Sequence, residues 1–175
     1  MIGIDMGVHH LLTLSNGVYV DIPNFSREAI EYACEAACSY GEDLVIERLT
    51  VFCSLGKDKK LPWLVTAYLT EEAARQGLTV TTVSARNTSK VCSNCDNWVG
   101  TKSDRRIYCK ECELLECRDI NAAINILKAG QGLFKPLPKL KKDKDEILYW
   151  GEPSYKQGSP HKLETVIDGV FYRRV

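Results

Sequence analysis

The sequence lacks any run of eighteen or more apolar residues, which is about the length that a membrane-crossing helix needs. Its first ten residues, MIGIDMGVHH, also lack the charged and apolar segments of a secretory signal peptide. Both absences predict a cytoplasmic protein that has no membrane partner. Cysteines are normally reduced inside the cell, so disulfide bonds are not expected.

The sequence also lacks net charge, because 23 lysines and arginines balance 23 aspartates and glutamates. The basic excess is local: residues 131–175 carry nine basic and six acidic side chains, while residues 1–130 carry 14 and 17. Proteins that hold nucleic acid by its phosphates usually have a basic surface. Strong general affinity for nucleic acid is therefore not predicted, and part of any such affinity is expected from another chain or a bound RNA.

Cysteine is abundant, and four of the eight cysteines form two CxxC pairs, Cys92 with Cys95 and Cys109 with Cys112. Two such pairs on facing hairpins bring four thiolates around one tetrahedral zinc ion. Four protein ligands leave no open position, so this zinc is predicted to be structural. The alternatives are two disulfide bonds or free buried thiols. The remaining cysteines show no ligand pairing, and two of them, Cys34 and Cys38, are expected on the packing face of a helix.

The apolar pattern predicts strands and helices in alternation. Strands are expected at residues 2–6, 11–14 and 18–22, and Asn16-Gly17 between the last two indicates a hairpin. Ser26 is a predicted N-cap, and Pro62 marks the first turn of a later helix. Further elements are expected in this order: a helix from Ser26 to Gly41, strand 43–47, helix 62–76, strand 78–83, and a helix from Asp119 to Ala129 ended by Gly130.

Three carboxylates sit where these elements would bring them together: Asp5 on the first strand, Glu47 at the end of the fourth, and Asp119 at the start of the last helix. In a mixed sheet whose first strand is central and next to the fourth, Asp5 and Glu47 become neighbours. Clustered carboxylates suit Mg²⁺ or Mn²⁺. Two such ions, ~3.5 to 4 Å apart, support phosphodiester hydrolysis. Asp5 is expected to bridge both ions.

Basic side chains near the cysteine pairs and Asp119 are candidate phosphate contacts, although a solvated basic surface explains each of them equally well. These residues are Arg86, Lys90, Arg105, Arg106 and Arg118. His9 and His10 follow the first strand, where a plain role at the entry to the next strand is favoured over a contact with phosphate or water.

Five motifs in this order carry a resemblance to a known family: GIDMG with Asp5, LVIERL with Glu47, TSKVCSNC, YCKEC, and RDINAAINIL with Asp119. Over residues 1–130 the chain resembles the RuvC-like nuclease half of the transposon-encoded TnpB/OrfB proteins, relatives of the type V CRISPR effectors. The resemblance implies an α/β, ribonuclease-H-like (RuvC-like) mixed sheet flanked by helices, with an inserted zinc-ribbon knuckle. It implies a catalytic triad of Asp5, Glu47 and Asp119, and RNA-guided DNA cleavage.

The chain departs from that family pattern at several points. Met1 stands directly before the first catalytic strand, so the amino-terminal half that grips guide RNA is expected to be missing. Asp96 and Glu113 replace the glycines that usually follow the CxxC pairs, and Cys117 replaces an acid. These changes are expected to weaken the turns of the zinc knuckle slightly and to spare the triad.

The predicted organisation has four parts. Residues 1–89 form the first part of the RuvC-like core, 90–116 the zinc-ribbon insertion, and 117–130 the last core helix. Residues 131–175 contain four of the six prolines and a lysine-rich stretch, and are expected to be a linker or binding tail.

Three functional hypotheses follow. The first is a metal-dependent DNA endonuclease that needs a separate chain or a guide RNA for targeting. The second is a resolvase that cuts branched DNA, which favours a homodimer. The third is a catalytically idle nuclease fold that binds nucleic acid or the transcription machinery. Three clustered carboxylates argue against the third, since they are costly to keep close without a metal.

Overall fold

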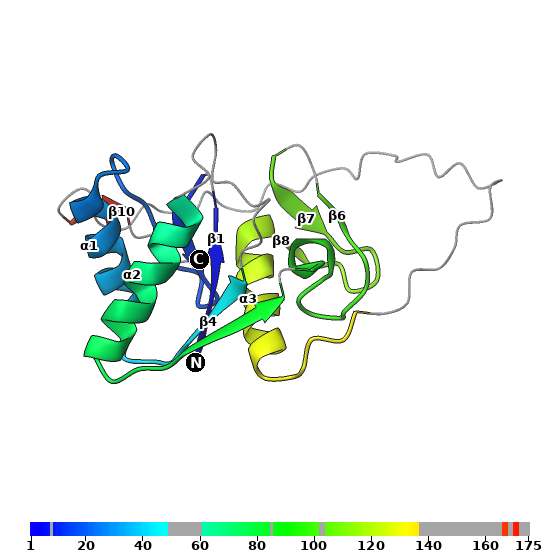
Figure 1. Cartoon of the computed structure of the whole chain (residues 1–175). Helices are drawn as coiled ribbons and strands as arrows, with labels where there is room; N and C mark the ends of the chain where they lie inside the picture. The colour runs from blue at the N-terminus through cyan, green and yellow to red at the C-terminus, as the bar shows by residue number, and fades with distance from the viewer. Residues whose placement is uncertain are drawn as a thin grey trace.

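The computed structural model describes residues 1–7, 9–48, 61–84, 86–101, 104–136, 166–167 and 170–171. Within these residues the chain forms a mixed α/β structure (Figure 1). In the described part of the chain, no helix has both the length and the apolar character that a membrane span requires. The glycine and lysines of residues 51–60 predict a loop, and the apolar residues 147–150 predict a strand; both segments lie outside the described residues.

The centre of the structure is a five-stranded sheet with the order β3-β2-β1-β4-β5. β1 (Ile2–Met6) is the middle strand, and β2 (Leu12–Leu14) and β3 (Tyr19–Val20) extend the sheet from it as an antiparallel meander. On its other side, β4 (Leu44–Arg48) and β5 (Val80–Ser84) pair in parallel. The predicted meander, and the predicted place of the fourth strand beside a central first strand, are confirmed.

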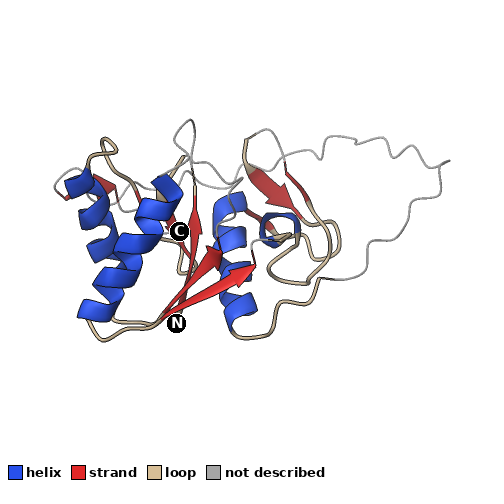
Figure 2. Ribbon diagram, viewed as in Figure 1, coloured by secondary structure: helices blue, strands red, loops and turns tan. Residues whose placement is uncertain are grey.

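Two helices cover one face of this sheet. α1 (Arg27–Cys38) begins at its predicted N-cap, where the hydroxyl of Ser26 accepts a hydrogen bond from the backbone N–H of Ala29 at 3.3 Å. α2 (Leu61–Arg75) has Pro62 in its first turn, as predicted. Figure 2 shows both helices on the same side of the strands. The main hydrophobic core lies between them and the sheet, and includes Ile2, Ile4, Leu12, Leu14, Leu44, Ile46, Ile30, Cys34, Cys38, Val65 and Leu69.

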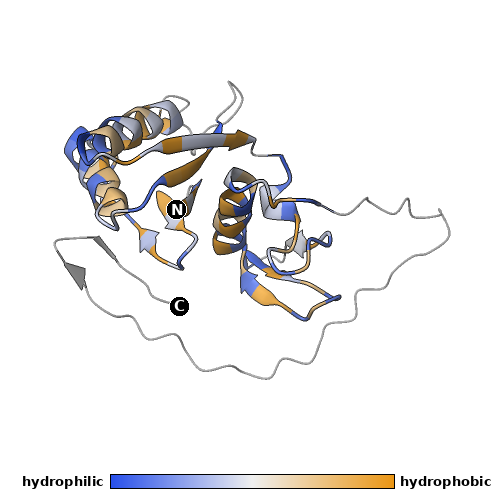
Figure 3. Cartoon of the chain, turned by 90° about the horizontal axis from the view of Figure 1, so that it is seen from below, coloured by the Kyte–Doolittle hydropathy of each residue, from blue (hydrophilic) through white to orange (hydrophobic). Residues whose placement is uncertain are grey.

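A single helix, α3 (Arg118–Gly130), packs on the opposite face, and Figure 3 shows it as a largely apolar helix beside the strands. The contact is close enough to require glycine at two positions. A Cβ atom on Gly3 would lie 2.1 Å from the carbonyl oxygen of Ala123, and one on Gly130 would lie 2.7 Å from the side chain of Val45. The sequence predicts that Gly130 ends the helix, but in the structure Gly130 lies within the last turn of α3 and allows the close approach of α3 to β4.

The residues between β5 and α3 form a small separate unit, here called the cysteine module (residues 88–117). It contains the 3₁₀ turn η1 (Thr88–Lys90) and a three-stranded antiparallel sheet of β6 (Gly100–Thr101), β7 (Arg106–Tyr108) and β8 (Leu115–Cys117). β8 runs directly into α3. The chain direction at the start of α3 is therefore set by the module.

Element ends differ from the predictions by one to three residues, and the largest difference is at the end of α1, which stops at Cys38 instead of continuing to Gly41. β5 begins at Val80 instead of residue 78, and α3 begins at Arg118, with Cys117 as its N-cap. In the carboxy-terminal part, the sequence of residues 165–172 predicts a strand with a turn at Asp168-Gly169, and in the structure β9 (Val166–Ile167) and β10 (Val170–Phe171) pair antiparallel.

Candidate metal centres

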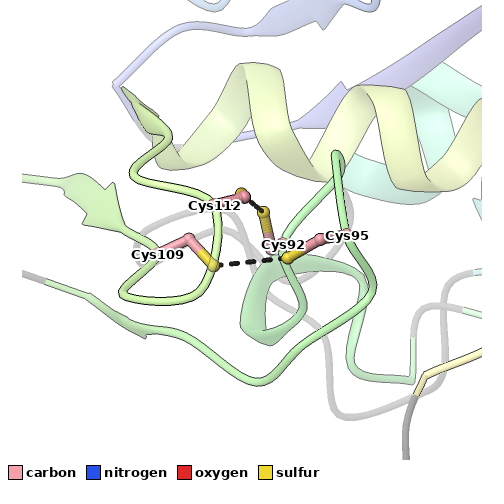
Figure 4. A group of neighbouring side chains, drawn as sticks. All are labelled: Cys92, Cys95, Cys109 and Cys112. Atoms are coloured by element: carbon pink, nitrogen blue, oxygen red, sulfur yellow. Dashed lines mark hydrogen bonds between the residues drawn. The ribbon is translucent and has the colours of Figure 1, made fainter.

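The four cysteines of the two CxxC pairs converge in the cysteine module (Figure 4). Their sulfur atoms all lie within 4.8 Å of one another. The sulfurs of Cys92 and Cys112 are 3.6 Å apart, and those of Cys95 and Cys109 are 3.4 Å apart. With zinc–sulfur bonds of ~2.3 Å, the edge of a regular ZnS₄ tetrahedron is about 3.8 Å. None of the four forms a disulfide bond, so the spacing fits four ligands of one metal ion.

Both turns of the cysteine module use a backbone conformation that favours glycine. Asp96, the residue after the first CxxC pair, has a φ of 60°, and Glu113, the residue after the second, has a φ of 59°. A side chain in this left-handed region costs roughly 1–2 kcal/mol. The departure from glycine noted in the sequence therefore falls at strained positions, although the four sulfurs still converge.

Asp5 and Glu47 occupy adjacent places on the sheet face that α3 covers. Ile4 of β1 pairs with Ile46 of β4, so Asp5 and Glu47 come next in the same register. Side chains two residues apart on a strand point to the same face. Gly3, two residues before Asp5, faces α3 at close range, and so does Val45, two residues before Glu47. Both carboxylates therefore belong to the α3 face.

Asp119 joins this face from the first turn of α3, where it is only 3% exposed. Burial raises the pKa of Asp5 well above its ordinary value, and the negative charges of Glu47 and then Asp119 raise it further. Burial also raises the pKa of Glu47, against the opposing effect of a hydrogen bond from Thr88. Asp5 therefore lies near enough to Glu47 and to Asp119 for their charges to disfavour its ionised form.

The carboxylates are less tightly gathered than the cysteines. Within the described residues, the ligand atoms of the four cysteines all lie within 4.8 Å of one another, whereas the oxygens of Asp5, Glu47 and Asp119 do not form such a group. The carboxylates differ from the cysteines in two respects: Asp5 is subject to the negative charges of Glu47 and Asp119, and Asp119 has a partner of its own. Their role as ligands of one magnesium or manganese site stays a prediction.

That partner is Arg105, which lies between the two CxxC pairs. Its Nη2 atom donates to both carboxylate oxygens of Asp119, at 2.8 and 3.0 Å. The Nε atom of Arg118 is 3.6 Å from the same carboxylate. The sequence analysis proposed both arginines as phosphate contacts, and no sequence pattern predicted this ion pair. It arises because the backbone N–H of Arg118 donates to the carbonyl of Arg105 at 2.9 Å, which sets the two residues side by side.

The other candidate phosphate contacts are Arg106, Arg86 and Lys90. Arg106 forms an ion pair with Asp104. The side chains of Arg86 and Lys90 are exposed, and both residues lie in the segment that precedes the first CxxC pair. Their suggested contact with nucleic acid stays a prediction.

His10 has defined partners near the end of β1. Its Nδ1 atom lies 2.9 Å from each carboxylate oxygen of Asp21, and its ring centre lies 4.2 Å from that of Tyr19. These contacts tie the loop after β1 to the end of the meander. They agree with the favoured structural role of this histidine at the entry to the next strand.

The fold and the cysteine group define a class: a mixed α/β protein in which four cysteines with the spacing of a metal site precede α3, the last helix of the described residues. Comparison with known families narrows the class. Residues 65–126, which include the cysteine module and Asp119, match the family model described as "Cas12f1-like, TNB domain". The resemblance to TnpB and the type V effectors that the sequence predicted is confirmed. A search of curated proteins found no match.

Solved structures with a similar fold include a Cas12f1 protein in complex with a single guide RNA and target DNA. The match has 16% identity and a TM-score of 0.51, and covers 72% of this chain and 49% of the Cas12f1 chain. Weaker matches are CasPhi-2 (Cas12j) bound to crRNA and DNA, at 19% identity and a TM-score of 0.45, and the mini RNA-guided endonuclease Cas_phi3, at 22% and 0.45. The match to CasPhi-2 covers 65% of this chain and 20% of CasPhi-2, and the match to Cas_phi3 covers 64% of this chain and 19% of Cas_phi3. The chain thus spans about half the length of the Cas12f1 chain.

Proposed function

We propose that this chain is the nuclease part of a divalent-metal-dependent DNA endonuclease with a ribonuclease-H-like fold. The observation that carries the proposal is the arrangement on the α3 face. Asp5 and Glu47 are adjacent in the register, and Asp119 lies close enough for its charge to raise the pKa of Asp5. Such an arrangement is unfavourable unless a cation offsets the repulsion. Magnesium or manganese ions held by the three residues would activate a water molecule and stabilise the leaving oxygen.

Each carboxylate is prepared for this role by its surroundings. Glu47 is oriented by the hydroxyl of Thr88, and Asp119 is held by Arg105. Asp5 follows Ile4 on β1, next to Glu47 in the register, and its side chain is partly buried. Ionised carboxylates are needed to hold a cation, so the raised pKa of Asp5 predicts that metal binding weakens as the pH falls.

We propose that the cysteine module holds one structural zinc ion and forms a zinc ribbon. The sulfur spacing and the short CxxC turns support zinc over a larger, oxygen-preferring ion. The four ligands Cys92, Cys95, Cys109 and Cys112 leave no position for a reacting water molecule, so the zinc would contribute stability and not chemistry.

We propose DNA as the substrate, and a guide RNA together with a separate protein chain as the partners that direct cleavage. The support is the likeness to Cas12f1, whose solved complex contains a single guide RNA and target DNA. This chain covers about half of the Cas12f1 chain, so a separate chain would supply the rest. The exposed Arg86 and Lys90, on the approach to the first CxxC pair, are proposed contacts with the nucleic-acid backbone.

The test is cleavage of single-stranded, double-stranded and branched DNA by the purified chain with Mg²⁺ or Mn²⁺. Asp5→Asn keeps the shape of the side chain and should abolish cleavage. Asp104→Asn, at an exposed carboxylate of the cysteine module, is the matched control and should leave cleavage unchanged. Cutting of branched DNA alone would favour the resolvase. Binding without cutting, even after addition of host RNA and protein, would favour a nuclease fold used only for binding, which the Arg105–Asp119 ion pair also allows.

A further inference from the structure

The cysteine module touches the carboxylate site at Glu47. Thr88, the first residue of η1, is 2% exposed, and its hydroxyl donates to Oε1 of Glu47 at 2.9 Å. Glu47 is far from Thr88 in the sequence, so the contact depends on the folded position of the turn. Four residues after Thr88, the chain reaches Cys92, the first cysteine of the candidate zinc site.

α3 holds this same turn through two buried asparagines. The side-chain amide of Asn125 donates to the carbonyl oxygens of Thr88 and Val91, at 2.8 and 2.7 Å. The amide of Asn121 also donates to Val91 at 2.8 Å, and its oxygen accepts from the backbone N–H of Ser93 at 2.8 Å. Both asparagine side chains are fully buried. The turn between Glu47 and Cys92 is therefore fixed at several points.

A second connection joins the module to Asp119. Arg105 lies between the two CxxC pairs, and its guanidinium binds both oxygens of Asp119. Its backbone is fixed beside the start of α3 by the hydrogen bond from Arg118. Two of the three carboxylates thus receive a hydrogen bond from the segment that carries the four cysteines.

We propose that the cysteine module acts as a positioning device for the carboxylate site, and that Thr88 is the residue that transmits zinc binding to Glu47. The proposal rests on the proposed function. Cys92 would be held by a bound zinc ion, Asn121 and Asn125 of α3 hold the turn before it, and the hydroxyl of Thr88 orients Glu47, which would hold a divalent ion. Two sites connected in this way are thermodynamically coupled, so each ion strengthens the binding of the other by the same factor.

Thr88→Val isolates this contact because valine keeps the volume of threonine and removes the hydroxyl. Loss of a hydrogen-bond partner to a metal ligand typically reduces metal affinity or activity by 10–100-fold. Thr88→Ser keeps the hydroxyl and should behave like the wild type. Any general loosening of the turn would affect both variants, whereas a positioning role affects only the valine variant.

The experiment titrates zinc-loaded protein with Mn²⁺, followed by electron paramagnetic resonance, and counts bound zinc by elemental analysis. We expect Thr88→Val to keep about one zinc ion and to bind Mn²⁺ roughly 10–100-fold more weakly. Thr88→Ser should restore the affinity. Equal Mn²⁺ affinity in Thr88→Val and wild type would overturn the inference. Asp5→Asn separates the two levels: if it binds Mn²⁺ as the wild type does, the proposed carboxylate site itself is wrong.

A second measurement on the wild type does not depend on how well the valine variant folds. The zinc affinity is measured by competition with a zinc-selective dye, with and without saturating Mn²⁺. Coupling predicts that Mn²⁺ tightens zinc binding in wild type and Thr88→Ser, and has no effect in Asp5→Asn. A zinc affinity in the wild type that Mn²⁺ leaves unchanged would contradict the proposal.

Discussion

The two candidate metal centres are built in different ways. The four cysteines come from two turns of one short segment, and their sulfurs already lie within 4.8 Å of one another. The three carboxylates come from β1, β4 and α3, so their positions relative to one another depend on the whole sheet and its covering helix. Burial raises the pKa of Cys92 to about 12 and also raises that of Cys109, so these two thiols lie together without mutual repulsion, while a hydrogen bond with Asn94 lowers the pKa of Cys112 to about 6. Carboxylates repel, and each is held by burial or by a partner of its own.

The two centres are therefore expected to have opposite effects on the free energy of unfolding: the cysteine group contributes to stability, and the carboxylates reduce it. A metal bound by the four cysteines would stabilise a module that is too small to form a large apolar core. Burying Asp5 beside two other carboxylates instead costs stability until a cation arrives. Removal of a ligand should therefore have opposite effects in the two places.

The largest effect is expected from Cys109→Ser. The variant should lose its zinc and with it the ordered structure of the cysteine module, because structural zinc contributes about 10–16 kcal/mol of apparent binding energy in zinc-finger peptides. Elemental analysis and hydrogen exchange of residues 88–117 measure the two losses. Cys117→Ser, at a cysteine outside the group, should keep about one zinc ion. Retention of zinc by Cys109→Ser would mean that the four cysteines do not act together.

The next effect concerns Arg105→Gln, which removes the partner of Asp119. A buried charged group without its partner costs about 1–3 kcal/mol, so the metal-free variant should unfold at lower urea concentration. Mg²⁺ should restore part of the loss, because the cation takes over from the guanidinium. Arg106→Gln breaks an exposed pair and should change stability by less than about 1 kcal/mol. Equal effects of the two substitutions would show that the Arg105 pair has no special role.

Asp5→Asn should stabilise the metal-free protein at neutral pH. The ordinary pKa of 3.8 is raised in the folded state, so between the two values the folded protein binds a proton that the unfolded chain has released. This contribution is complete below the ordinary pKa and is lost as the pH rises through the raised one. Each pKa unit corresponds to about 1.4 kcal/mol. Urea unfolding across the pH range should show a smaller decline in the variant, with Glu47 causing what remains.

A lower stability of Asp5→Asn would contradict this expectation. A variant less stable than the wild type at neutral pH, in metal-free buffer, would show that the Asp5 carboxylate makes favourable contacts and is not held under repulsion. In Mg²⁺ the order should reverse, because only the wild type gains from the ion.

The smallest expected effect is that of Glu113→Gly, which tests the turn of the module. Glycine relieves the left-handed backbone at this position, and the gain is reduced by the greater freedom of glycine in the unfolded chain. A net stabilisation of about 0.5–1 kcal/mol is expected, with the zinc content unchanged. Thermal unfolding of the zinc-loaded protein measures it. Glu111→Gly, beside it in the same turn, is the matched control and should not stabilise.

The sheet and helices could be predicted because their signals are local. The Asn16-Gly17 turn, the N-cap Ser26 and the alternating apolar residues of β1 each determine an element by themselves. The position of Asp5 next to Glu47 required one further assumption, that the first strand is central. The role of Gly130 could not be predicted, because the side chain of Val45 that it accommodates belongs to another strand.

The contacts around the carboxylates were harder to predict. Arg105 was identified as a basic residue near Asp119, but its ion pair depends on how the β7–β8 hairpin enters α3. The contact of Thr88 with Glu47 has no sequence signal at all. Asn121 and Asn125 did carry a signal, since two asparagines four residues apart within an apolar helix indicate a buried polar face toward another segment.

The most direct test of the carboxylate site is a crystal soaked in Mn²⁺ and measured near the manganese absorption edge. The account predicts anomalous density between β1, β4 and the start of α3, with Asp5, Glu47 and Asp119 oxygens at about 2.1 Å, close to the distance that magnesium adopts. Zinc at the four cysteines provides an internal reference peak at its own edge. Zinc density without manganese at the three carboxylates, in a crystal where these side chains remain apart, would contradict the account.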